Sequence, residues 1–143
     1  MAKTFTTLLL LSMTSISNAA NWIDVDHDES RTIQIDYDSL QNIGTAQTPI
    51  AKAWVKLTNF EDDAKNDFFK GEYVIGMHHY DCLAKKIRYL SFTAYDTQGK
   101  VKISEKHDSP IYEEVIPDSV GEDMLKGACT ALKMKFKLNK LKI

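Results

Sequence analysis

Two adjacent histidines, His78 and His79, are the residues of this chain best suited to hold a metal ion or haem. Imidazole nitrogens bind transition metals and haem iron. Neighbouring residues of a strand point to opposite faces, so the pair cannot serve one site from an ordinary strand. His27 or His107 would have to complete such a site. The simpler interpretation, which we favour, places one histidine in the core and the other on the surface of a sheet.

Other groups of residues that are typical of enzymes are missing from the sequence. It contains no Gly-rich phosphate loop, no serine elbow and no metal-binding helix motif. Its 20 acidic residues include no pair at a spacing that indicates acid–base catalysis. We therefore expect a protein that is not an enzyme, with no cofactor and no metal site.

Trp54 is a candidate binding residue with two interpretations. Together with Lys52 and Lys56 it would form an exposed contact site, because the centres of interfaces favour Trp and Tyr. Alternatively, a helix covers this face of the sheet and Trp54 belongs to the core. We favour the core, because a helix packed on a sheet needs large side chains beneath it.

Residues 131–143 form a basic amphipathic tail whose candidate binding residues are Lys133, Lys135, Lys137 and Lys140. Residues 20–123 carry 11 Lys and Arg against 20 Asp and Glu, a net charge of −9, whereas residues 124–143 carry +6. An acidic body argues against nucleic-acid binding, which needs a basic face on the folded part. The apolar residues of the tail fit strand spacing and helix spacing equally well. The tail either contacts anionic envelope lipid or an acidic partner, or merely keeps a helix or an edge strand soluble.

The first 19 residues have the features of a secretory signal peptide. Lys3 supplies the positive charge, residues 5–16 form an apolar core too short to span a bilayer comfortably, and residues 17–19 suit cleavage before Ala20. A buried N-terminal helix is the alternative. No cysteine lies near the cleavage point, so we expect no lipid anchor. No second apolar stretch reaches membrane-spanning length, and we expect an exported protein, periplasmic or at the cell surface.

Export makes a disulfide the expected state of Cys82 and Cys129, the two cysteines of the chain. They lie 47 positions apart, unlike the closely spaced pairs of zinc and redox motifs. Closing a loop of this size removes unfolded-chain entropy worth about 4 kcal/mol. Two buried free thiols are the alternative.

Residues 117–132 have the pattern of an amphipathic helix. Ser119 and Glu122 form a capping box, in which each side chain satisfies a backbone N–H at the start of the helix. One apolar stripe follows at three- and four-residue steps, made of Val120, Met124, Leu125, Ala128, Cys129 and Leu132. Cys129 therefore faces whatever the helix covers.

The residues before this helix predict strands, at 22–25, 32–37, 50–58, 72–82, 86–95 and 101–105. Residues 41–49 are expected to form a loop and residues 112–116 a short extended link. The fold class is thus α+β, with a five- to six-stranded antiparallel sheet and a C-terminal helix tethered to one face by the disulfide.

Several short motifs resemble the surface-adhesin protein E-like domain of Gram-negative bacteria over residues 20–130. They are Trp22, the run Asp36-Tyr37-Asp38, the run 54–56, the pair Asp81-Cys82, Arg88, Tyr95-Asp96 with Gly99, and the run IPDSVGEDML before Cys129. The resemblance implies an antiparallel sheet whose concave face carries a C-terminal helix held by the disulfide. It also implies adhesion to host matrix or plasma proteins.

The resemblance completes the expected organisation: a signal peptide at 1–19, an adhesin E-like domain at 20–130 and the basic tail at 131–143. The founding adhesin is a lipoprotein, and this chain lacks the cysteine for that anchor. The alternative function is therefore a soluble periplasmic protein with an envelope-interaction role. A haem-binding role, as described for a relative, would use His78 and His79.

Overall fold

The computed structural model describes residues 19–59, 61, 62 and 69–140, with the last three of these by backbone alone. The expected signal peptide lies outside the described residues except for its last position. The described strands are β1 (Trp22–His27), β2 (Arg31–Asp36), β3 (Gln41–Asn42), β4 (Ile50–Asn59), β5 (Tyr73–Asp81), β6 (Lys86–Tyr95), β7 (Val101–Lys106) and β8 (Glu113–Glu114), followed by the helix α1 (Val120–Lys140).

All strand pairs are antiparallel, in the order β1-β2-β4-β5-β6-β7. The two-residue strands β3 and β8 pair with β4 and β6 respectively. The expected α+β fold is confirmed, and its six predicted strands correspond to the six long ones. The two short strands fall in segments expected to be a loop and a link, because two residues are too few to show a periodic pattern.

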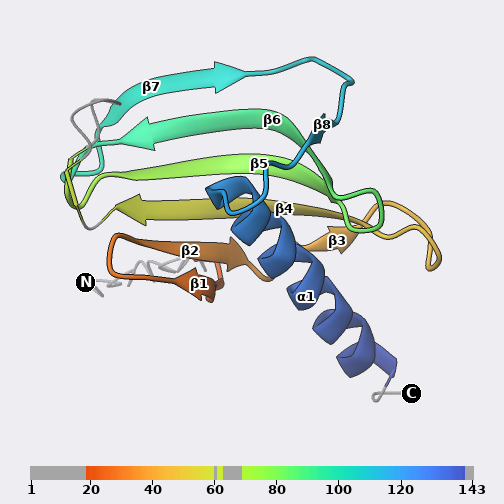
Figure 1. Cartoon of the computed structure of the whole chain (residues 1–143). Coiled ribbons are helices and arrows are strands. Elements are labelled where there is room, and N and C mark those ends of the chain that lie inside the picture. The colour runs from red at the N-terminus through yellow and green to blue at the C-terminus, as the bar shows by residue number, and fades with distance from the viewer. Residues whose placement is uncertain (1–18, 60, 63–68, 141–143) are drawn as a thin grey trace, which may run out of the picture.

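Helix α1 lies diagonally across one face of the sheet, and its C-terminal end extends past the strands (Figure 1). We call this side the helix face and the opposite side the open face. The core is formed where α1 meets β2, β4 and β5, and its buried side chains include Ile33, Ile35, Ala51, Ala53, Val55, Tyr80, Leu125, Ala128 and Leu132. Burying such apolar surface is the main stabilising contribution to folding.

The disulfide between Cys82 and Cys129 is present, with an S–S distance of 2.06 Å. Cys82 follows β5 directly, and Cys129 lies in the middle of α1. The covalent tether therefore joins the centre of the helix to the end of a central strand, as the sequence predicted.

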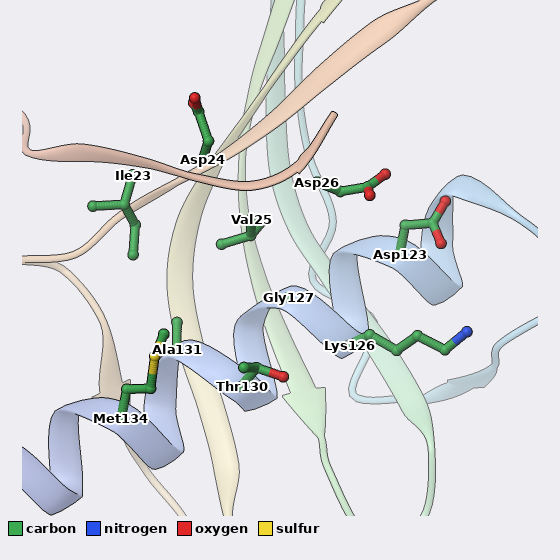
Figure 2. Close-up of a pocket in the computed structure, with 10 residues that line it drawn as sticks. All are labelled: Ile23, Asp24, Val25, Asp26, Asp123, Lys126, Gly127, Thr130, Ala131 and Met134. Atoms are coloured by element: carbon green, nitrogen blue, oxygen red, sulfur yellow. The ribbon is translucent and has the colours of Figure 1, made fainter. Parts of the chain in front are cut away.

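Close contact between α1 and β1 depends on Gly127. A Cβ atom at this position would lie 2.6 Å from the Cγ2 atom of Val25. Figure 2 shows the groove where the helix passes β1, with Val25 above Gly127 and with Asp26 and Asp123 toward one end. Any larger residue at 127 would push the helix away from the strand.

The start of α1 is held by the two residues expected to cap it. The Ser119 side-chain oxygen accepts a hydrogen bond from the Glu122 N–H at 3.3 Å. The Glu122 carboxylate accepts one from the Asp118 N–H at 2.9 Å. Arg31 adds an ion pair to Asp123 at 3.2 Å and so joins β2 to the first turn of the helix.

The same helix continues through the tail, which settles the choice between helix and strand. The boundary expected between residues 130 and 131 falls inside α1. Ala131 and Leu132 are almost completely buried in the core. Up to Lys140, the tail is thus an extension of the helix and not a separate segment.

Candidate binding surface

Trp54 lies on the open face of the sheet, and the interpretation that placed it in the core is wrong. Its neighbours Ala53 and Val55 are buried on the helix face, so strand alternation turns Trp54 outward. The helix packs on small residues of β4 and needs no tryptophan beneath it. Trp54 remains 38% exposed.

Further aromatic residues surround Trp54 on the open face. Trp22, Trp54, Ile75 and Tyr95 line a shallow hollow of about 340 Å³ that extends from β1 to β6. Tyr95 also stacks on Tyr73 with 4.8 Å between ring centroids. The Lys56 ammonium lies 4.8 Å from the centre of the Tyr73 ring. The surface therefore combines flat aromatic area with positive charge.

A row of three basic side chains crosses the central strands beside Trp54. Lys52 of β4 pairs in register with His79 of β5, and His79 pairs with Arg88 of β6. Adjacent strands are about 4.8 Å apart, so side chains in register on one face are close neighbours. We call Lys52, His79 and Arg88 the basic row.

The described ion pairs include no carboxylate partner for the basic row. The Arg88 Nε donates to the Ser109 carbonyl at 2.8 Å, and the His79 Nδ1 lies 3.3 Å from the Tyr112 hydroxyl. Burial lowers the pKa of His79, and the positive charges of Arg88 and Lys52 lower it further. The positive charges of Lys52 and Arg88 therefore disfavour protonation of His79, which lies between them.

His78 lies on the helix face, opposite His79. It is 7% exposed, and its Nδ1 is 2.9 Å from the hydroxyl of the fully buried Tyr80. Because the two histidines point to opposite faces, they cannot bind one haem or metal ion together. His107, one of the two residues expected to complete such a site, lines the same pocket as His78. No group of three or more His, Cys, Asp or Glu side chains among the described residues could hold a metal ion.

The four candidate lysines of the tail differ in environment. Lys133 and Lys137 are exposed, next to the half-exposed Met134 and Phe136. Lys135 turns inward: its ammonium donates to the backbone carbonyls of Tyr37 and Leu40 at 2.6 and 2.7 Å, and it lies 4.8 Å from the Tyr37 ring centroid. Lys135 therefore fastens α1 to the turn after β2. The side chain of Lys140 lies outside the described residues.

Replacing Arg88 with Gln should raise the pKa of His79, because Arg88 lowers this pKa more than Lys52 does. Lys52→Gln should raise it by a smaller amount. A titration of the His79 imidazole signal by NMR measures both changes, and Lys100→Gln, in the β6–β7 turn, is the matched control. An unchanged His79 pKa in both variants would show that the row is not electrostatically coupled.

Replacing Lys135 with Ala should destabilise the fold by about 1–3 kcal/mol, because two partly buried carbonyls lose a charged donor. Lys133→Ala, two positions away on the exposed side of α1, should change stability by less than about 0.5 kcal/mol. Urea denaturation followed by circular dichroism compares the two. Equal effects would contradict the structural role of Lys135.

None of the described helices is long and apolar enough to cross a membrane. No curated protein and no solved structure matches the chain significantly. The profile of the family described as surface-adhesin protein E matches residues 22–130, which include the sheet, the disulfide and the first half of α1. The chain belongs to the surface-adhesin protein E family.

Proposed function

We propose that this protein is an exported, non-catalytic adhesin that attaches to host matrix or plasma proteins through the open face of its sheet. The observation that carries the proposal is the exposure of Trp54 on a central strand, beside the basic row. Membership of an adhesin family supports binding in preference to catalysis, and supports an exported or surface location.

The open face has the composition of the centre of an interface. Trp and Tyr are enriched where proteins meet, and a few such residues supply most of the binding free energy. Trp54 lies between Lys52 and Lys56 of its own strand. The stacked pair Tyr73 and Tyr95 lies on the neighbouring strands β5 and β6. A partner that covered this area would bury aromatic surface that is now in contact with water.

The basic row indicates the charge of the partner. Residues 20–123, which include the row, are strongly acidic as a whole, with a net charge of −9. A cationic row on this background favours one orientation toward an acidic surface and disfavours others. An acidic partner would also offset the positive charges of Lys52 and Arg88, and would so favour protonation of His79.

Trp54→Ala should weaken binding at least tenfold, because truncating a central interface tryptophan costs about 2 kcal/mol or more. The measurement is surface plasmon resonance of the mature protein over a panel of immobilised, purified matrix and plasma proteins. Lys52→Gln combined with Arg88→Gln should slow association and reduce the dependence on salt. The control is Leu83→Ala, an exposed apolar residue in the β5–β6 turn. Wild-type affinity of Trp54→Ala for every panel protein that binds would exclude the open face as the contact surface.

The helical tail favours a second candidate function, contact with the anionic envelope. Lys126, Lys133 and Lys137 lie on the exposed side of α1, spaced by seven and four residues, and so form one cationic stripe. Met134 and Phe136 are 49% and 45% exposed on the same helix. A basic helix with exposed apolar residues suits the interface of an anionic membrane.

The double variant Lys133→Gln/Lys137→Gln should lose most salt-sensitive binding to vesicles containing anionic lipid. Substitutions are preferable to deleting the tail after Thr130, because Ala131 and Leu132 belong to the core. Vesicle co-sedimentation measures binding, with Lys100→Gln/Lys106→Gln as an equally charged control. Equal sedimentation of the two double variants would remove the tail from consideration.

A further inference from the structure

A pocket of about 350 Å³ lies on the helix face, where the first turns of α1 leave part of the sheet uncovered. Its floor comes from β4 and β5, and its walls come from β6, the residue after β7 and the start of α1. The volume lies within the range of small-molecule sites. The apolar lining consists of Val55, Leu57, Val74, Gly76, Phe92, Val120 and Met124, and the polar lining of His78, Tyr89, Ser91 and His107.

The pocket offers almost no charge. No Lys, Arg, Asp or Glu is among the described residues that line it. Burial, reinforced by the neighbouring His79, lowers the pKa of His78 to about 4, so its imidazole is neutral at neutral pH. His107, at the rim, has the Glu105 carboxylate 3.9 Å away. An ionised ligand group would therefore lose its hydration here without gaining an opposite charge.

His78 presents one free nitrogen to this pocket. Its Nδ1 is engaged with the Tyr80 hydroxyl, and its ring meets Tyr80 and Tyr89 edge to face. The ring lies against Gly76, where a Cβ atom would be 2.6 Å from Nε2, so any larger residue would displace it. Nε2 has no hydrogen-bond partner within the described part of the chain. It is nevertheless not completely enclosed by protein atoms, so a small molecule can reach it. A side chain that is 93% buried thus points an unused hydrogen-bonding atom at an apolar pocket.

We propose that this pocket binds a small uncharged molecule with an alkyl body and one hydroxyl group, and that the hydroxyl bonds to Nε2 of His78. If the Tyr80 hydroxyl donates to Nδ1, Nε2 carries the proton and donates; in the other tautomer Nε2 accepts. A hydroxyl group can both accept and donate, so it matches either state. The alkyl body covers the apolar residues of the floor and the Met124 side chain.

This site does not depend on the proposed attachment to host proteins. The pocket lies on the helix face, whereas Trp54 and the basic row lie on the open face. Loss of either activity would leave the other in place, so an experiment on one face does not decide the other.

The test is an NMR titration of the mature protein at pH 7.5 with 1-octanol and, separately, with octanoate of the same chain length. Octanol should shift the His78 imidazole signals in a saturable manner and leave those of His79, on the opposite face, unmoved. Octanoate should bind at least tenfold more weakly, because its carboxylate finds no cation in the pocket. Unmoved His78 signals, or equal binding of the two compounds, would overturn the proposal.

A variant pair locates the site. Val120→Trp fills the wall of the pocket at the start of α1 and should weaken octanol binding at least tenfold. Val101→Trp is the matched control, because Val101 is an exposed β7 residue that does not line the pocket. Equal binding by both folded variants would contradict the assigned location. The octanol and octanoate titrations of the wild-type protein decide the proposal even if Val120→Trp does not fold.

Discussion

The attachment of one helix to one face of the sheet is the constraint on which the rest of this structure depends. The Cys82–Cys129 bond fixes the middle of α1 to the end of β5, and Lys135 fastens its later turns to the carbonyls of Tyr37 and Leu40. A helix is about 10 Å wide with its side chains, and six strands extend over about 24 Å. One helix therefore cannot cover a six-stranded sheet, even on its own side. The uncovered part of the helix face contains the pocket, and the whole opposite side is the open face.

This division gives neighbouring residues very different chemistry. His78 and His79 are adjacent in β5. His78 is a neutral imidazole buried on the helix face, whereas His79 is part of the basic row on the open face. Ala53 and Trp54 differ in the same way on β4. On β4 the residues against the helix include the small side chains Ala51 and Ala53, which let α1 approach this strand closely. Trp22, Trp54 and Tyr95 lie on the other side, where a partner can reach them.

The sequence predicted those parts of the fold that rest on local pattern. The stripe from Val120 to Leu132 predicted the helix, and the strands followed from period-two alternation. Trp54 was misplaced because alternation shows that Ala53 and Trp54 differ in side, but not which side the helix covers. The sequence could not distinguish a helical tail from a strand because the apolar residues of the tail fit both periods. The contact that distinguishes them, Lys135 with two backbone carbonyls, joins residues more than 90 positions apart.

The basic row was missed although part of it could be counted from the sequence. The turn between β5 and β6 sets Asp81 opposite Lys86, so two steps back His79 must face Arg88. Beyond this point the register shifts at Leu90, which is the extra residue of a β-bulge. The sequence around Leu90 gives no indication of this bulge. The placement of Lys52 beside His79 depends on the register between β4 and β5. The connection between these strands is long, so the register cannot be counted from a tight turn.

The most direct test of the account is an NMR footprint of the mature protein in complex with a matrix or plasma protein that it binds. The Trp54 indole and His79 imidazole signals should change, while those of Met124 and Ala128 on the helix side should not. Changes confined to the helix face, with Trp54 unaffected, would contradict the assignment of the open face as the binding surface.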